Sequence, residues 1–247
     1  MVSIIIPAYN QLAYTRQAIA SIRAHTPPPY ELVLVDNAST DGTLAYFRSL
    51  PGAVVVANPV NQGHAGGTNR GIERSRGEVL VLLNNDVLVT AGWLDNLLRA
   101  LGSAPDVGMV GPVTNYSFAP RQQVEVPYRD LSAMPAWAAR YNAGPDCWEE
   151  TDFLLGFCLV VKRRVVEEVG LLDEARFALG FFDDNDYSWR VRRAGYRLLI
   201  ARNTFLHHFG SVTLKQQNPA ETTRAFTEAA RRFRAKVAGA GEDPERV

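Results

Sequence analysis

From Val2 to about Val110, short apolar runs alternate with longer amphipathic segments. The apolar runs are rich in β-branched residues or leucine and are bounded by Pro, Asn, Asp or Gly, which is typical of buried strands. We expect strands at Val2–Ile6, Leu32–Val35, Ala53–Ala57 and Glu78–Leu83, and helices at Gln11–Ala24, Thr40–Ser49 and Ala65–Ser75. This alternation predicts right-handed crossovers and a mainly parallel sheet with helices on both faces.

The second half of the chain has a less regular pattern. Residues 115–152 contain prolines and aromatic residues without a steady period, so we expect long loops with one short helix there. The elements expected further on are strands at Phe153–Val161 and Tyr196–Ala201, and helices at Lys162–Val169, Asp184–Ala194 and Ala220–Val237. The last residues, Gly239 to Val247, are expected to fray.

Composition excludes several classes of protein. The chain has 247 residues, and its 26 Lys and Arg equal its 26 Asp and Glu, so the basic excess of a nucleic-acid-binding protein is missing. The longest apolar run, Phe153 to Val161, is too short to cross a bilayer, and the N-terminus has no signal-peptide pattern. Two cysteines, Cys147 and Cys158, are too few for a disulfide framework or a zinc site. We expect a cytoplasmic α/β protein.

The candidate chemistry lies at the carboxyl ends of the expected strands, where such sheets bind ligands. After one strand comes Asn84-Asn85-Asp86. Asp86 can offer a hard oxygen to Mg²⁺ or Mn²⁺, and Asn84 can hydrogen-bond a ribose hydroxyl. The alternative is a simple polar turn, because Asn and Asp are common turn residues.

Asp36 follows another of the expected strands. Its carboxylate can accept the imino hydrogen of a pyrimidine or guanine base, while the loop Pro7–Asn10 packs beside the ring. The alternative is that Asp36 and Ser39 cap the next helix. We favour base recognition.

A glycine-rich segment, Asn61 to Gly71, lies at the next junction between a strand and a helix. Its glycines can let the backbone approach a ligand, and a helix N-terminus favours an anion. The segment lacks both the dinucleotide fingerprint and the P-loop lysine, which weighs against a dinucleotide oxidoreductase. We interpret His64 as a packed or surface residue rather than a ligand.

Two polar clusters follow in the second half. Asp183, Asp184 and Asp186 lie next to bulky aromatic residues, and a partly shielded carboxylate can act as a general base. The alternative is an acidic helix N-terminus, which the helix dipole favours. The pair His207-His208 follows a strand, and neutral imidazole is a common metal ligand.

Taken in order, these segments resemble family 2 glycosyltransferases with the A-type glycosyltransferase fold, from Val2 to about Thr213. The matching segments are Val2–Asn10, Val35–Gly42, Asn61–Gly71, Leu83–Asp86, Gly170–Glu174, Phe182–Asp186, Arg193–Arg197 and His208–Ser211. The Asn-Asn-Asp form is most similar to the subgroup of rhamnosyltransferases and surface-glycan transferases. The resemblance implies a three-layer α/β/α sandwich in residues 1–218. Its nucleotide-sugar-binding half would be 1–110 and its acceptor-binding and catalytic half 111–218, followed by a C-terminal helix and tail at 219–247.

The resemblance also implies roles for single residues. Asp184 would be the base, although Asp183 replaces the family's usual Glu, so either acid is a candidate. Asp86 and His208 would hold Mn²⁺ or Mg²⁺, and Asn84 replaces the first acid of the family's Asp-x-Asp motif, which leaves fewer charges on the metal. The expected nucleotide-binding residues are Pro7, Ala8, Tyr9, Asn10, Asp36, Asn61, Gly63, Asn69, Asn84 and Asn85.

The implied activity is transfer of a sugar, with inversion, from a nucleotide-diphosphate donor to an acceptor hydroxyl. UDP- or dTDP-sugars are the favoured donors. The acceptor would be a carbohydrate, a lipid-linked glycan or a protein in the synthesis of surface polysaccharide or glycoconjugates. Two alternatives are an inactive nucleotide-sugar or glycan-binding module and a sugar nucleotidyltransferase, but the second needs a basic glycine-rich loop that is missing after Asn10.

The acceptor side depends on aromatic and basic residues. Phe157, Phe182 and Trp189 could stack on sugar rings or simply fill the core. The C-terminal helix carries Arg and Lys beside an apolar stripe, which is compatible with contact to a membrane surface. Packing of this stripe on the domain is the favoured interpretation.

Overall fold

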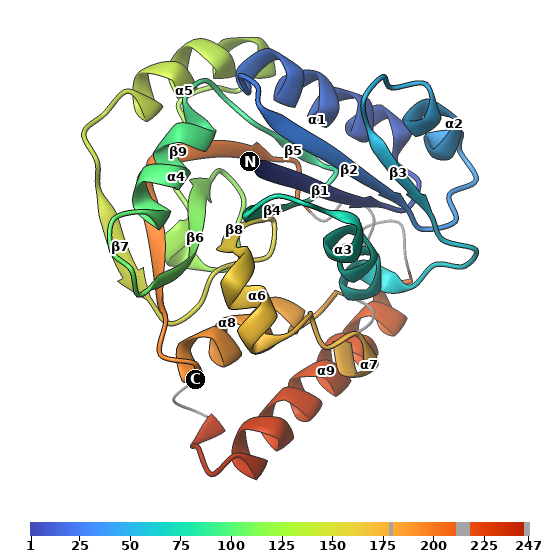
Figure 1. Ribbon diagram of the computed structural model, residues 1–247, viewed down its shortest axis with the longest axis vertical. Coiled ribbons are helices and arrows are strands. Elements are labelled where there is room, and N and C mark those ends of the chain that lie inside the picture. Colours follow the sequence, from blue (N-terminus) through green and yellow to red (C-terminus); the bar gives the residue numbers. More distant parts are fainter. Residues whose placement is uncertain (178–179, 211–217, 245–247) are drawn as a thin grey trace.

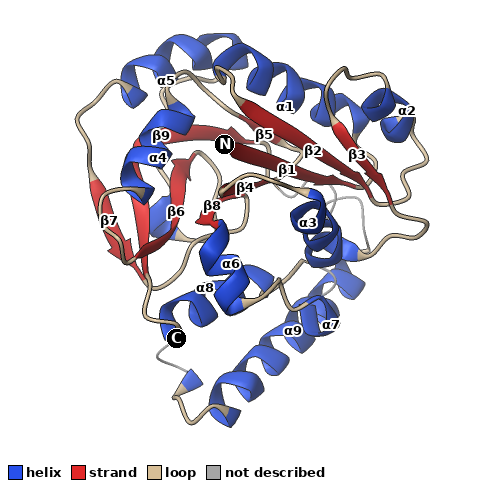
Figure 2. Ribbon diagram, viewed as in Figure 1, coloured by secondary structure: helices blue, strands red, loops and turns tan. Residues whose placement is uncertain are grey.

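A continuous sheet crosses the protein, with helices on both of its faces (Figures 1 and 2). The structure is a computed structural model that describes residues 1–177, 180–210 and 218–244. Within these residues the sheet has nine strands in the order β3-β2-β1-β4-β8-β6-β9-β5, and β7 also pairs with β9. The strands are β1 Val2–Ala8, β2 Tyr30–Asp36, β3 Val54–Ala57, β4 Val79–Leu83, β5 Val87–Leu88, β6 Val107–Thr114, β7 Trp148–Thr151, β8 Cys158–Lys162 and β9 Arg197–His208.

Nine α-helices connect or flank these strands in the described part of the chain. They are α1 Leu12–His25, α2 Thr43–Arg48, α3 Gly63–Arg74, α4 Trp93–Leu101, α5 Met134–Asn142, α6 Arg163–Val169, α7 Glu174–Phe177, α8 Asp183–Arg193 and α9 Pro219–Gly239. Two short 3₁₀ helices, Pro120–Gln122 and Leu131–Ala133, lie in the long connection before α5.

The first half of the sheet is parallel, as its alternating pattern predicts. Strand β1 pairs in parallel with β2 and β4, and β2 pairs in parallel with β3. In this register Ala8 lies opposite Asp36, so the carboxyl ends of β1 and β2 meet at one edge. The second half adds antiparallel pairs of β8 with β4 and β6, and of β5 and β7 with β9.

Side chains of the central strands alternate between two cores. Ile4 and Ile6 pack on one face with residues of α1, α2 and α4. Ile5 packs on the other face with residues of α3, α6 and α8. Because successive strand residues point to opposite faces, a strand that is apolar throughout needs a helical layer on each side. The expected three-layer α/β/α architecture is confirmed.

The expected strand Phe153–Val161 is too long. Only Cys158–Lys162 is a strand, because the preceding backbone is held by side chains from elsewhere. The N–H of Leu154 donates to Ser188 Oγ, that of Leu155 to Gln122 Oε1 and that of Gly156 to Asp184 Oδ2. In the other direction, the expected strand Tyr196–Ala201 is too short, since β9 continues to His208 along β6 and β5.

The C-terminal helix α9 packs as an outer layer against α7 and α8 (Figure 1). Its Phe233 and Val237 are buried with Phe177 and Trp189, so the apolar stripe faces the domain. The expectation of fraying from Gly239 is wrong for the described tail, because Glu242 accepts a hydrogen bond from Trp189 Nε1 at 2.9 Å. Residues 245–247, and Ser211 and Thr213 of the segments that carry the resemblance, lie outside the described residues.

No helix in residues 1–177, 180–210 and 218–244 combines the length and apolar composition needed to cross a bilayer.

Candidate active site

The carboxyl ends of β1 and β2 are fastened to each other. The N–H of Asn37 donates to Ala8 O at 2.8 Å, and the N–H of Asn10 donates to Ser39 Oγ at 2.8 Å. In return, Asn10 Oδ1 accepts from the N–H of Thr40 at 2.8 Å. Asn10 therefore joins the two loops, and its carboxamide oxygen is already used by the protein.

Asp36 is 1% exposed at the end of β2. One of its oxygens, Oδ2, accepts from the N–H of Ser39 at 3.2 Å, and the other, Oδ1, is buried without a hydrogen-bond partner. Helix α2 begins only at Thr43, whose N–H donates to Asp41, so the helix-capping alternative for Asp36 and Ser39 is wrong. A buried acceptor without a donor is costly, and a ligand N–H would satisfy it.

Of the other expected base-binding residues, Pro7 and Ala8 are buried within β1, and Tyr9 is half-buried beyond the end of the strand. Pro7 lies beneath α3, where a Cβ on Gly67 would come within 3.1 Å of its Cβ. Tyr9 and Asp36 are thus the residues best placed at this edge.

The glycines of α3 serve packing rather than ligand approach. A Cβ on Gly71 would lie 2.3 Å from Ile5 Cγ2, and one on Gly67 would lie 2.5 Å from Asn37 Nδ2. Both positions need glycine because the helix lies directly on the sheet and its edge loops. The expected approach of this segment to a ligand is therefore corrected at these two residues.

Asn69 is also held within the fold. Its Nδ2 donates to Leu172 O at 2.9 Å and to Glu174 Oε2 at 2.8 Å, and its Oδ1 accepts from the N–H of Leu172 at 3.0 Å. These contacts saturate the buried carboxamide, which corrects its expected role in nucleotide binding. Asn61 accepts from the N–H of Gly63 at 2.9 Å, so it shapes the start of α3.

Three consecutive side chains after β4 have three different partners. Asn85 Nδ2 donates to Thr15 Oγ1 at 3.0 Å, which ties the loop to α1. Asn84 Oδ1 faces His64 Nε2 at 3.1 Å. Asp86 Oδ1 lies 3.3 Å from His208 Nε2. Asn85 and Asp86 do form a turn, but the side chains of all three residues are engaged in tertiary contacts, so the segment is more than a simple polar turn.

Strand pairing brings Asp86 and His208 together. His208 lies opposite Val87 in the β5–β9 pair, and the N–H of Phe209 donates to Asp86 O at 3.1 Å. His208 Nε2 is buried and has no hydrogen-bond partner. A buried nitrogen that faces a carboxylate oxygen fits a pair of ligands for one hard divalent cation. The described residues contain no cluster of three or more His, Cys, Asp or Glu that could hold a metal alone, so other ligands would come from substrate and water.

The neighbouring His207 has a different environment. It points to the other side of β9, where its Nδ1 forms a hydrogen bond of 2.8 Å with the Tyr128 hydroxyl. Burial lowers the pKa of His207 to about 4, so it is neutral near pH 7. His207 therefore belongs to the fold and His208 to the candidate site.

The amino end of α8 carries the two candidate bases. Asp183 is 3% exposed, and its Oδ2 lies 2.7 Å from His64 Nδ1. Asp184 accepts from the N–H of Gly156 and from that of Asn185, each at 2.9 Å. Burial and then the charge of Asp183 raise the pKa of Asp184 to about 7. A carboxyl with such a pKa can accept a proton near neutral pH.

Gly156 and Phe157 join the two parts of the site. The N–H of Gly156 holds Asp184, while the Phe157 ring stacks on His208 with a centroid distance of 5.4 Å and an angle of 16°. The backbone oxygen of Phe157 accepts from the N–H of Asn84 at 3.0 Å. Gly156 and Phe157 thus contact three parts of the site: the loop that follows β4, the end of β9 and the start of α8.

The aromatic residues expected to stack on an acceptor are largely used in packing. Phe157 is buried against His208, and Trp189 of α8 is 5% exposed and packs on Phe233 of α9. Neither ring has a free face for a sugar, which corrects that expectation. Phe182 is half-buried and contacts Phe226, which is 51% exposed, so this pair remains at the surface beside Asp183.

His64 is the residue of the site that sequence reasoning missed. It contacts both Asp183 and Asn84, although it was interpreted as a packed or surface residue. Its position in the first turn of α3, directly after the strand-to-helix loop, was the available signal. Its carboxylate partner, Asp183, lies 119 residues further along the chain, so no local pattern shows the contact.

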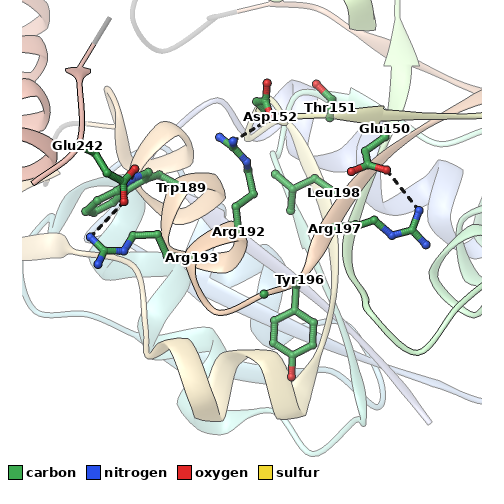
Figure 3. A pocket seen from close by; sticks show the side chains of 11 residues that line it. Glu150, Thr151, Asp152, Trp189, Arg192, Arg193, Tyr196, Arg197, Leu198 and Glu242 are labelled. Carbon is green, nitrogen blue, oxygen red and sulfur yellow. Dashed lines mark hydrogen bonds and ion pairs between the residues drawn. The ribbon is translucent and has the colours of Figure 1, made fainter. Parts of the chain in front are cut away.

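A separate pocket of about 330 Å³ lies at the other end of α8 (Figure 3). Its arginines are paired with carboxylates: Arg192 with Asp152, Arg193 with Glu242, and Arg197 with Glu150 and Asp106. These pairs neutralise the pocket, so nothing in it favours an anionic donor.

Comparisons with known proteins show what the chain as a whole is similar to. The sequence profile of Glycosyl transferase family 2 matches residues 3–170. The uncharacterized protein y4gI of Sinorhizobium fredii is 30% identical over 92% of this chain, which spans only 26% of that protein. N-acetylglucosaminyl-diphospho-decaprenol L-rhamnosyltransferase of Mycobacterium tuberculosis is 27% identical over 81% of this chain and 73% of its own.

One solved structure shows the same fold. Mannosyltransferase PcManGT from Pyrobaculum calidifontis, in complex with GDP-Man and Mn²⁺, superposes with a TM-score of 0.64 and 23% identity. The superposition covers 98% of this chain and 76% of that one.

Proposed function

The chain belongs to glycosyl transferase family 2, and on that premise we propose that it transfers a sugar with inversion from a nucleotide-diphosphate donor to an acceptor hydroxyl. The A-type glycosyltransferase fold supports a donor site at the carboxyl ends of β1, β2 and β4. The observation that carries the proposal is Asp184, an accessible carboxyl with a pKa of about 7 beside the loop that follows β4.

We assign the nucleotide base to the edge formed by Tyr9 and Asp36. Asp36 Oδ1 would accept the imino hydrogen of uracil or thymine, which supports a UDP- or dTDP-sugar as donor. Guanine offers an equivalent N–H, and PcManGT was solved with GDP-Man, so GDP belongs in the test.

Asp86 and His208 would hold the divalent cation, as their mutual distance and the free Nε2 of His208 suggest. A bound Mn²⁺ or Mg²⁺ would supply positive charge for the departing diphosphate. PcManGT contains Mn²⁺, which supports the same use here.

The reaction would be a single in-line displacement. Asp184 accepts the proton of the acceptor hydroxyl, whose oxygen forms a bond to the anomeric carbon from the side opposite the diphosphate. The bond between the anomeric carbon and the diphosphate oxygen breaks, and its electron pair stays with the nucleotide. The N–H groups of Gly156 and Asn185 hold the Asp184 carboxylate in place. Attack from the opposite face inverts the anomeric configuration.

The acceptor side would be the surface beside Asp183 and Asp184. Phe226 and Phe182 present apolar area there, which suits a glycan carried on a lipid diphosphate. The similarity to a rhamnosyltransferase named for a decaprenyl-linked acceptor supports this class and a role in surface polysaccharide synthesis.

The test is a thermal-shift panel of UDP, dTDP, GDP and CDP with Mn²⁺, followed by hydrolysis assays with the matching sugar donors. At a nucleotide concentration of about 100 Kd, we expect UDP or dTDP to raise Tm by about 5 °C or more. Asp36→Asn should reduce this shift. An amide has only one acceptor oxygen, so it cannot accept from both the N–H of Ser39 and an N–H of the base, as the two carboxylate oxygens can. Absence of any shift with all four nucleotides would overturn the proposal.

A further inference from the structure

His64 links the two halves of the candidate site through one ring. Its Nδ1 lies 2.7 Å from Asp183 Oδ2 at the start of α8, and its Nε2 lies 3.1 Å from Asn84 Oδ1 after β4. The side chain is 28% exposed, whereas that of Asp183 is 4% exposed. A Cβ on Gly180 would come within 3.0 Å of His64 Cβ, so the backbone at Gly180 packs against the base of this side chain.

The surroundings of the ring favour the imidazolium form. Both ring nitrogens face oxygen acceptors, and an imidazole donates from both only when both carry a proton. Burial favours the neutral ring, but the charge and hydrogen bond of Asp183, with the charge of Asp184, outweigh it and raise the pKa of His64 above its ordinary value. On the other elements packed near the ring, Arg70 of α3 pairs with Glu174 of α7 at 3.2 Å and with Glu73 at 3.4 Å, and Asp186 of α8 pairs with Arg190 at 2.7 Å.

The contact divides two adjacent carboxyls into different roles. Asp183 is buried and its Oδ2 is occupied by the ring. Asp184 is more exposed and is held by two backbone N–H groups, so it keeps acceptor capacity for a substrate hydroxyl.

We infer that His64 is a positioning residue for the proposed transfer: it binds Asp183 as an imidazolium, anchors α8 to Asn84, and leaves Asp184 as the carboxyl that takes the acceptor proton. The inference rests on the proposed function and names the residue that selects its base. A second carboxylate next to the base would otherwise be buried without a cation and would compete for the same proton.

The charge of His64 can be measured without any substrate. The chain has four histidines, so ¹⁵N-histidine correlation spectra are simple, and the His64 signals are assigned by their loss in His64→Gln. We expect both ring nitrogens to be protonated at pH 7, and we expect Asp183→Asn to lower the pKa of His64. A neutral ring at pH 7, or an unchanged titration in Asp183→Asn, would overturn the inference.

Measurements of kcat and KM distinguish a positioning role of His64 from a merely structural one. With the donor that the nucleotide panel identifies, His64→Gln should lower kcat by about tenfold or more while the donor KM changes less than about threefold. In the Asp183→Asn background the same substitution should cost less than about threefold, because the carboxylate that needed the cation is gone. Equal losses in both backgrounds would overturn the inference. His25→Gln, on α1, is the matched control and should leave kcat unchanged.

Failure of the proposed function gives a different result. A wild-type protein that binds no nucleotide and hydrolyses no donor would overturn that function. The NMR titration would still decide whether His64 is the cationic partner of Asp183.

Discussion

Two carboxyl groups on α8, less than one turn apart, are held in opposite ways. Asp184 has only backbone N–H donors and an acidic neighbour, and its pKa is raised to about 7. Asp186 is fully buried between Arg190 Nε at 2.7 Å and Lys236 Nζ at 2.6 Å. The first environment keeps a carboxyl reactive near neutral pH, and the second uses a carboxylate to hold the fold.

The same contrast separates two regions. The edge to which we assign the chemistry consists of the carboxyl ends of β1, β2 and β4 with the first turn of α8. The C-terminal corner consists of α7, the rest of α8 and α9, where Lys236 also pairs with Asp173 at 2.8 Å. Substitutions at the edge should change chemistry or binding with little loss of stability, and those at the corner should lower stability with little change in chemistry or binding.

The largest effect is expected for Asp184→Asn. Loss of the base should lower kcat by about 10²- to 10⁴-fold, while the nucleotide Kd measured by calorimetry stays nearly constant. Near-normal turnover in this variant would exclude Asp184 as the base and would remove the distinction between the two carboxyls.

Asp186→Asn, in the C-terminal corner, should lower stability instead. Removing one partner leaves Lys236 and Arg190 without their buried counter-ion, so the free energy of unfolding should fall by about 3–5 kcal/mol in urea titrations. Glu228→Gln is the control on α9, since its pairs with Arg231 and Arg232 are at the surface, where water and salt screen them, and its loss should be much smaller. Equal losses in both variants would contradict a special role for the buried group.

The pH dependence follows from the raised pKa of Asp184. The base must be deprotonated, so kcat should fall about tenfold for each pH unit below about 7. Because the native pKa lies above that of the unfolded chain, Asp184 contributes stability below about pH 4, and this contribution is lost as pH rises through about 7. Asp184→Asn should therefore gain stability relative to wild type at pH 8. A pH-independent kcat between pH 5 and 8 would contradict the assignment.

The smallest effect is expected for Trp189→Phe. The variant loses the hydrogen bond to Glu242, which should cost about 1 kcal/mol of stability, and the acceptor KM should not change. A large rise in acceptor KM would instead indicate that Trp189 stacks on the acceptor sugar.

The predictability of the molecule from its sequence follows the same division. In the parallel half, the alternation of short apolar strands with amphipathic helices was enough to predict the elements, because each element has its own local pattern. The start of β8 was misplaced because the backbone of Leu154, Leu155 and Gly156 donates to side chains from distant segments. The contact of Lys236 with Asp186 joins residues far apart in the sequence, so the local hydrophobic periodicity does not predict it.

At the candidate site, the position of residues at the strand ends was enough to predict that they lie at one edge of the sheet. Their individual roles were harder to predict. Asn69 resembles a ligand-binding residue in sequence, but its amide is saturated by Leu172 and Glu174. His64 is the reverse case, since its two partners, Asp183 and Asn84, lie on distant segments of the chain.

The most direct test of the account is the stereochemistry of the reaction at Asp184. The anomeric proton of the sugar released from the donor can be followed by ¹H NMR in the first minutes of hydrolysis, before mutarotation, with water as acceptor. The account predicts that the first product has the anomeric configuration opposite to that of the donor, and that Asp184→Asn forms it far more slowly. A first product with the donor's configuration would contradict the single displacement with Asp184 as base.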